Sequence, residues 1–373
     1  MVEISVIIPV YRESRLLPKI LDKLLNQKIN SKLYEIIVII DEPTKYSLEL
    51  AKKYSKKVKF ILNKKRVGKA IALNKAVKHS SGRILLFLDS DILLPEDKNY
   101  LKKVIEEMKD TDILDIKKEV IKDSFLSRMT YYEYIGFNIG SWFLSKFARK
   151  CPSVNGSAFA MRRKVFTSLK GFRRVVAEDL DIAIRAFIKN YKFKYTKRVK
   201  VCNSVHSNWK NWFIQRKRWA IGCGLFLKEW YRDLLKACVK QPQIFIPFLF
   251  FLNPSLILIL LYLFVPNLLV YKIISLIFLF LAVKLNFVLP VLWLSTLSVD
   301  FIKNSLASLL SFLSFSTVFF ILSKKLEFDF KFHEFLIYYF FYSLLNLFIT
   351  IIGIITALLF EKKALKIISD WKI

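Results

Sequence analysis

Pairs of acidic residues follow two of the most apolar short segments of this sequence. The segment EIIVII is followed by Asp41 and Glu42, and the segment RILLFL by Asp89-Ser90-Asp91. Carboxylates just beyond a buried strand can bind a hard divalent cation such as Mg²⁺, which completes its coordination with water and substrate phosphates. Such a cation would neutralise a diphosphate leaving group. Asp-x-Asp on its own also occurs in solvated turns and helix N-caps, so its role depends on its surroundings.

Two segments further along the chain could act on the same substrate. Glu178 and Asp179 begin a helical pattern, where a carboxylate could remove a proton from an attacking hydroxyl, although acids also favour the first turn of any helix. On a helix, Gln215 and Trp219 share a face, with Arg218 beside them. Arg218 could bind phosphate oxygens and Trp219 could stack on a sugar ring. The simpler alternative is a basic, aromatic belt at a membrane surface.

The segments that must position these residues alternate between strand and helix patterns. We expect strands at Ser5–Val10, Glu35–Ile40, Lys59–Leu62 and Ile84–Leu88. We expect helices at Ser14–Gln27, Lys45–Ser55 and Gly68–His79. This alternation is typical of an α/β fold with a mostly parallel, doubly wound sheet covered on both faces. Ligands bind such sheets beyond the carboxyl ends of the strands, where the acids lie.

The composition favours a water-soluble part joined to a membrane part. The 373 residues are 54% hydrophobic and include 61 Lys and Arg against 30 Asp and Glu, a net charge of +31. The mean hydropathy is +0.36. Such a charge suits nucleic acid, an anionic lipid surface or a phosphate-bearing substrate. No nucleic-acid-binding motif is present, and acids at strand ends do not suit a nucleic-acid groove, so we expect no nucleic-acid partner.

Long apolar runs follow residue 242. They are Ile244–Val265, Leu268–Leu297, Ser305–Ser323 and Phe335–Phe360. About 20 apolar residues cross a bilayer as a helix, so we expect about four membrane helices. The lysines at 362–366 then obey the positive-inside rule, whereas those at 324–331 would lie on the wrong side. No basic segment or cleavage site accompanies the first apolar run, so we expect the first domain to be cytosolic.

Between these parts, Tyr131–Phe147 and Asn208–Tyr231 are rich in aromatic and basic residues. Such helices often lie in the plane of a membrane surface, and we favour this interpretation because apolar runs follow directly. Ordinary amphipathic helices packed on the sheet are the alternative.

Taken together, the motifs resemble family 2 inverting glycosyltransferases with a GT-A fold. The resemblance is to the membrane-bound branch that includes cellulose, chitin and hyaluronan synthases and ceramide glucosyltransferase. The matching segments, in the family's order, are Pro9–Glu13, Asp41, Arg66–Asn74, Asp89–Asp91, Asn155–Ser157, Glu178–Asp179 and Gln215–Trp219. The resemblance covers about residues 2–225 and extends to the apolar C-terminal runs.

The resemblance implies a role for each matching residue. A nucleotide sugar, in the first place a UDP-sugar, would contact Pro9, Tyr11, Glu13, Asp41, Lys69, Asp89 and Arg218. Asp91 would bind Mg²⁺ or Mn²⁺. Asp179 would be the catalytic base, and Glu178 would orient the acceptor. The acceptor would also contact Gly156, Ser157, Gln215 and Trp219.

The implied enzyme transfers a sugar, with inversion, to a polysaccharide or lipid-linked acceptor at the cell membrane, with its catalytic domain in the cytosol. Residues 1–115 would form the nucleotide-sugar half of the GT-A domain, 116–242 the acceptor half with interfacial helices, and 243–373 the membrane region. A polyprenyl-phosphate acceptor and a non-enzymatic basic membrane protein that binds an anionic polymer remain alternatives. Two departures from the family pattern stand out, Glu42-Pro43-Thr44 for Asp-Gly-Ser and Ala177 for Thr.

Overall fold

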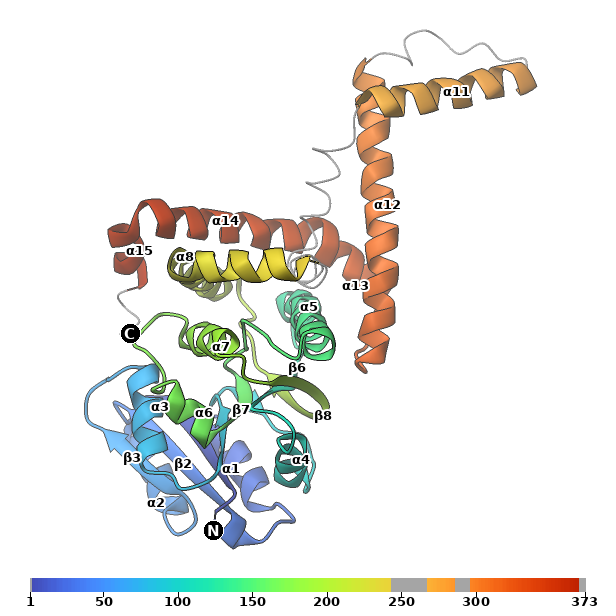
Figure 1. Ribbon diagram of the computed structural model, residues 1–373. Helices are drawn as coiled ribbons and strands as arrows, with labels where there is room; N and C mark the ends of the chain where they lie inside the picture. The colour runs from blue at the N-terminus through green and yellow to red at the C-terminus, as the bar shows by residue number, and fades with distance from the viewer. Residues whose placement is uncertain (1, 243–266, 286–295, 369–373) are drawn as a thin grey trace.

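A computed structural model describes residues 2–242, 267–285 and 296–368 (Figure 1). The strands are β1 (Ile4–Tyr11), β2 (Tyr34–Asp41), β3 (Lys59–Asn63), β4 (Ile84–Leu88), β5 (Ile92–Leu93), β6 (Ile113–Val120), β7 (Ala158–Arg162) and β8 (Phe193–Asn203). The helices up to residue 242 are α1 (Leu17–Leu25), α2 (Lys45–Tyr54), α3 (Lys69–Lys78), α4 (Tyr100–Glu107), α5 (Phe125–Phe147), α6 (Arg163–Ser168), α7 (Glu178–Ile188) and α8 (Trp209–Lys240), with a 3₁₀ turn at Ser31–Leu33. The later helices are α11 (Asn267–Leu285), α12 (Thr296–Lys325), α13 (Phe332–Ile337), α14 (Ser343–Leu359) and α15 (Glu361–Ile368), with a π-helical turn, η3, at Tyr338–Tyr342.

All eight strands form one sheet in the order β3-β2-β1-β4-β7-β6-β8-β5. β1 is parallel to β2 and β4, β2 to β3, and β6 to β8, whereas β7 is antiparallel to β4 and β6, and β5 to β8. The expected mostly parallel α/β sheet is therefore confirmed, with β7 and β5 as its antiparallel strands. The expected boundary at residue 115 falls inside strand β6, and β7 of the second part pairs with both β4 and β6. Residues 1–115 and 116–242 therefore share one core.

The first strands show why the local sequence specifies this half of the sheet. Successive residues of a strand face opposite sides. In β2, Ile36, Val38 and Ile40 belong to the core cluster that includes α1. Ile37 and Ile39 belong to the cluster on the other face, which includes α3. Both faces are covered, as the unbroken apolar runs predict.

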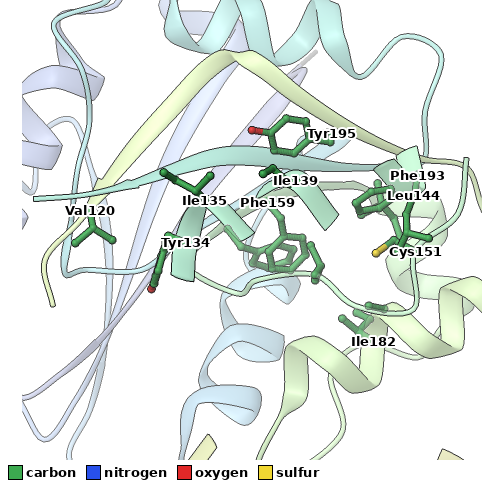
Figure 2. Close-up of a cluster of buried hydrophobic side chains, with 14 of the residues drawn as sticks. Val120, Tyr134, Ile135, Ile139, Leu144, Cys151, Phe159, Ile182, Phe193 and Tyr195 are labelled. Carbon is green, nitrogen blue, oxygen red and sulfur yellow. The ribbon is translucent and has the colours of Figure 1, made fainter. Parts of the chain in front are cut away.

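Several aromatic and aliphatic residues of α5 are part of this core, contrary to the interfacial interpretation of Tyr131–Phe147, although Phe147 at its end is 54% exposed. Tyr132, Tyr134, Ile135 and Ile139 are each at most 5% exposed. Figure 2 shows several of these α5 side chains packed with residues of the β-sheet. Because the protein itself covers these side chains, lipid cannot reach them. The alternative interpretation, a helix packed on the sheet, is therefore correct for this part of α5. On α8, Trp209 is 52% exposed, and an interfacial position for that helix stays a prediction.

Two segments of the C-terminal region are long and apolar enough to cross a membrane, Lys303–Lys325 and Phe332–Leu359. They correspond to the third and fourth expected membrane helices. The first expected run, Ile244–Val265, lies outside the described residues. The second, Leu268–Leu297, is described only in part, as α11 and the start of α12. About four membrane helices therefore stays a prediction.

Candidate active site

The carboxyl ends of β1, β2 and β3 are aligned, with Tyr11, Asp41 and Asn63 in one row of the sheet. Asp41 is only 5% exposed. Its carboxylate accepts hydrogen bonds from Asn63 Nδ2 at 2.8 Å and from the backbone N–H groups of Val67 and Gly68 at 3.0 Å each. Gly68 has φ of 94°, a value that favours glycine, and caps the start of α3. Asp41 thus fixes the loop that leads into α3, and its predicted contact with a nucleotide stays a prediction.

Tyr11 and Glu13 lie at the outer part of this edge. Tyr11 is 47% exposed, the guanidinium of Arg66 lies 4.3 Å from its ring centre, and its hydroxyl donates to Glu42 at 3.3 Å. Glu13 accepts a hydrogen bond of 2.6 Å from Thr44. Glu42 and Thr44, which depart from the family pattern, therefore contact residues that match it. An exposed aromatic ring beside an arginine is suited to stacking on a planar base.

Lys69, the first residue of α3, lies at the centre of the acidic group. Its Nζ is 2.8 Å from Asp89 Oδ1 and 3.4 Å from Glu178 Oε1. Burial lowers the pKa of Lys69, but attraction to these carboxylates outweighs it and raises the pKa well above its usual value. One small cavity is lined by residues that include Pro9, Lys69, Asp89, Gly156, Glu178 and Asp179. The structure thus brings together sequence segments that are far apart along the chain.

Asp91 lies beside Asp89 at the end of β4. Burial and the charge of Asp89 raise the pKa of Asp91 to about 6, although Lys69 and Arg218 act in the opposite direction. A carboxylate whose pKa is raised beside a second one gains from a bound cation. The described part of the chain has no group of three His, Cys, Asp or Glu side chains that could hold a metal ion. The residues therefore fit a Mg²⁺ or Mn²⁺ site with one or two protein carboxylates, the kind that substrate phosphates complete.

Asp179 is oriented at the start of α7 by two backbone N–H groups. Its Oδ2 accepts from Gly156 and its Oδ1 from Leu180, each at 2.9 Å. A Cβ atom at Gly156 would lie 2.8 Å from Asp179 Oδ2, so only glycine leaves room for this contact. For the neighbouring Glu178, burial raises the pKa, Lys69 lowers it and Asp179 raises it again, with a net increase.

Ser157 connects this loop to the Asp-x-Asp segment. Its carbonyl accepts from the backbone N–H of Asp89 at 2.9 Å, and its own N–H donates to Asn155 at 3.1 Å. It is 7% exposed, so its predicted acceptor contact would use a nearly covered side chain.

The helix α8 contributes Arg218 to the site. Burial lowers the pKa of Arg218, while Glu178, Asp179, Asp89 and Asp91 act in the opposite direction, which places its charge near both acidic pairs. Trp219 has its ring 4.4 Å from the guanidinium of Arg216. Gln215, one turn earlier, is half-buried.

Comparison with known proteins shows that the first part of the chain is similar to one enzyme family. Residues 5–169 match the profile of glycosyl transferase family 2. These residues are therefore similar to family 2 glycosyltransferase domains. The probable glycosyltransferase YdaM of Bacillus subtilis is 27% identical over 235 residues, which are 59% of this chain and 55% of YdaM. The poly(ribitol-phosphate) beta-glucosyltransferase of Bacillus spizizenii is 37% identical over 93 residues, 24% of this chain and 15% of the relative.

A solved structure shows the same fold as the glycosyltransferase domain. The mannosyltransferase PcManGT from Pyrobaculum calidifontis, in complex with GDP-Man and Mn²⁺, aligns with a TM-score of 0.51 and 21% identity. The alignment covers 62% of this chain and 64% of that one. The chain thus spans between about a seventh and two thirds of the length of these relatives. The GT-A fold, with C-terminal helices after it, is therefore confirmed.

A buried charged pair next to the candidate site was missed in the sequence. Arg216 and Glu133 are 2% and 3% exposed and form an ion pair. Arg216 also donates to the hydroxyl of Tyr342 at 3.2 Å, and that hydroxyl donates to Glu133 at 3.0 Å. Arg216 lies within the Gln215–Trp219 motif, in which only Gln215, Arg218 and Trp219 were given roles. A lone acid in the apolar segment around Glu133 was the available signal, because buried charges require partners.

Proposed function

We propose that this chain is a membrane-bound inverting glycosyltransferase that transfers a sugar from a UDP-sugar to a polysaccharide or lipid-linked acceptor. The observation that supports it most is the convergence of Asp89–Asp91 and Glu178–Asp179 around Lys69, with the charge of Arg218 beside them. The Asp89–Asp91 pair suits a diphosphate with a bound cation. The Glu178–Asp179 pair suits a hydroxyl that must lose a proton. The family 2 domain and the apolar C-terminal helices fit the same proposal.

Asp179 is the proposed catalytic base. Its two hydrogen-bonded oxygens hold the carboxylate in one orientation, as removal of a proton from an acceptor hydroxyl requires. The hydroxyl oxygen then forms a bond to the anomeric carbon while the bond from that carbon to the diphosphate oxygen breaks. Attack from the side opposite the leaving group inverts the anomeric centre. Glu178, held by Lys69, is proposed to orient the acceptor.

The leaving nucleoside diphosphate carries the negative charge that develops in this step. Lys69 and Arg218 are proposed to attract it, and such preorganised charges usually contribute the largest part of catalysis. A Mg²⁺ or Mn²⁺ ion at Asp91 would supply further charge neutralisation. The Mn²⁺ in the PcManGT complex is consistent with this use of a metal. The base and ribose would contact Pro9, Tyr11, Glu13 and Asp41.

The acceptor would approach from the side of Gly156, Ser157, Gln215 and Trp219. One experiment tests the donor, the acceptor class and the reaction together. Membranes that contain the full chain are incubated with labelled UDP- and GDP-sugars and Mn²⁺, with membranes containing the Asp179→Asn variant as the matched control. We expect transfer from one UDP-sugar by the natural chain only. Label in an organic extract identifies a lipid-linked acceptor, and label in insoluble material identifies a polysaccharide. The absence of transfer from every donor would contradict the proposed function.

A further inference from the structure

The segment Phe332–Leu359 is long and apolar enough to cross a membrane. However, one of its ends contacts the glycosyltransferase domain, and the other contacts α8, which is joined to that domain by the Arg216–Glu133 ion pair. We infer that this segment does not cross the bilayer. It lies along the membrane surface on the side of the glycosyltransferase domain, with one apolar face in the boundary between lipid headgroups and acyl chains. The partner of this face is a lipid bilayer, and the inference holds whichever sugar and acceptor the enzyme uses.

The turn before the segment is fixed to the glycosyltransferase domain by buried contacts. Lys117 of β6, 2% exposed, donates to the carbonyl of Glu327 at 2.8 Å. The hydroxyl of Tyr131 accepts from the backbone N–H of Asp329 at 2.9 Å. The hydroxyl of Tyr132 accepts from the backbone N–H of Lys331 at 2.9 Å. This turn therefore lies on the same side of the membrane as β6 and α5.

The other end of the segment contacts α8, which the Arg216–Glu133 ion pair joins to the same domain. In α15, Glu361 forms an ion pair of 2.6 Å with Lys228 of α8. Ala364 is fully buried in a cluster with Ile221 of α8 and Ala357 of α14. A helix that crosses a bilayer has its ends about 30 Å apart on opposite sides. Two ends held against one domain, one of them through α8, do not fit that arrangement.

The middle of the segment is packed closely along α8, as Figure 1 shows for α14. Small residues lie four positions apart on both helices, Ala220 and Gly224 on α8 and Gly353 and Ala357 on α14. A Cβ atom at Gly353 would overlap Ala220, and one at Gly224 would lie 2.6 Å from Ala357. Such small-residue contacts let two helix backbones approach closely. α14 is therefore held along its length by the helix that carries Arg218.

The face of the segment that points away from α8 is apolar and exposed. We call it the outer face, and it consists of Phe341, Leu345, Phe348, Ile352, Ile355 and Leu359, which repeat at helical spacing. Phe348 and Leu359 are each 70% exposed. Lys362 and Lys363, also exposed, follow it directly and can attract anionic lipid headgroups. An apolar stripe with cations at its end is the pattern of a helix in the membrane surface.

This orientation also removes the conflict between the two groups of lysines. In Figure 1, α12 runs crosswise to α14, with its C-terminal part beside α5 and its other end beyond the domain. The end beyond the domain can enter the bilayer while α14 lies along the bilayer surface. The lysines at 324–331 and those at 362–366 are then on the same side as the glycosyltransferase domain. Both groups obey the positive-inside rule together, which a crossing of Phe332–Leu359 would not allow.

The depth of the outer face in the bilayer tests the inference. Single cysteines are introduced by Phe341→Cys, Phe348→Cys and Leu359→Cys into the full chain, with its native cysteines replaced by serine. They are spin-labelled in vesicles of phosphatidylcholine and phosphatidylglycerol, and relaxation by oxygen and by a water-soluble nickel complex reports depth. We expect three similar, shallow depths. If the label at position 348 were deepest in the bilayer and the labels at 341 and 359 were shallow, the segment would be a crossing helix. Full exposure to water at all three, or spin–spin contact between copies, would show that lipid does not cover this face.

A labelling experiment tests the same inference without a probe in the outer face. Asp329→Cys and Lys363→Cys lie before and after the segment, and Lys56→Cys in the glycosyltransferase domain is the matched control. A membrane-impermeant maleimide is applied to vesicles in which the glycosyltransferase domain faces outward and, separately, to vesicles in which it faces inward. We expect all three cysteines to react in the same vesicles. Reaction of Lys363→Cys from the side opposite to Lys56→Cys would overturn the inference. This outcome is independent of enzyme activity, so it separates failure of the inference from failure of the proposed function.

Discussion

At the residue scale, the site concentrates negative charge before any substrate arrives. Burial and the charge of Asp89 raise the pKa of Asp91 to about 6, and a diphosphate would add further negative charge. Lys69 is already paired with Asp89 and Glu178. We therefore expect EDTA to abolish sugar transfer and added Mg²⁺ or Mn²⁺ to restore it, measured as labelled product in membranes. Undiminished transfer in EDTA would contradict the proposed metal at Asp91.

The roles of the two neighbouring acids can be separated by substitution. Asp179→Asn keeps the shape of the side chain but removes the proposed base. We expect kcat to fall about 10²–10⁴-fold, while UDP binding measured by calorimetry stays within a few-fold of that of the natural chain. Glu178→Gln is the comparison, because it removes an ion pair with Lys69 and should weaken acceptor binding more than the chemical step. Near-normal turnover by Asp179→Asn would exclude it as the base.

At the scale of helices and strands, the local sequence pattern was sufficient to predict an element wherever residues close in sequence determine which of its side chains are buried. The strands and helices expected in the first 115 residues all form, with ends shifted by a few residues at most. β6, with sequence ILDIKKEV, was not expected because it contains charged residues. Its Asp115 and Lys118 are buried together as an ion pair, and its buried Lys117 pairs with Glu119 and contacts the turn before α13. The last of these partners lies about 210 positions away, which no local pattern reveals.

The same reasoning explains what could be predicted of the site. Motif residues in order along the chain were expected at one edge of the sheet, and Lys69, Asp89, Glu178 and Asp179 do line one cavity. The contact of Arg216 with Glu133 joins α8 to α5 across 83 positions. It depends on the packing of whole helices and could not be derived from spacing.

The ion pair between α5 and α8 yields a stability prediction. Arg216→Met leaves Glu133 buried without its cation, and we expect a loss of about 3–5 kcal/mol in the free energy of unfolding. The double variant Arg216→Met with Glu133→Leu removes both charges and should recover much of that loss. The thermal unfolding midpoint in detergent measures both. A double variant as unstable as the sum of the single variants would show that the two charges do not interact.

The close contact between α8 and α14 yields an activity prediction. Gly353→Leu forces the two helices apart because a side chain there overlaps Ala220. Displacement of α8 moves Arg218 away from the acidic group, and a shift of about 1 Å can reduce turnover about 10²-fold. We expect a fall in kcat of about 10–10²-fold in membranes. Ile352→Leu is the matched control, because Ile352 is 58% exposed on the outer face. Equal activity of the two variants would show that α14 does not position α8.

At the scale of the whole molecule, a net charge of +31 is combined with apolar helices that lie beside the glycosyltransferase domain. The family 2 domain, α8 and α14 form successive layers in Figure 1, with α14 farthest from the sheet. If the outer face of α14 rests on lipid, the membrane surface lies one helix away from Arg218. An acceptor anchored in lipid could then reach the site without leaving the membrane.

This arrangement makes the activity depend on the charge of the lipid surface. Each lysine near an anionic membrane contributes about 1 kcal/mol to membrane binding. This attraction falls off over a Debye length of about 10 Å at 0.1 M salt. We expect the purified chain to be several-fold more active in vesicles that contain phosphatidylglycerol than in phosphatidylcholine alone. The difference should shrink as salt rises, and should also shrink in a Lys362→Gln, Lys363→Gln variant. Lys56→Gln with Lys57→Gln, distant in sequence from α14, is the matched control. Equal activity in both lipids at low salt would mean that the position of α14 does not depend on electrostatic attraction to the membrane.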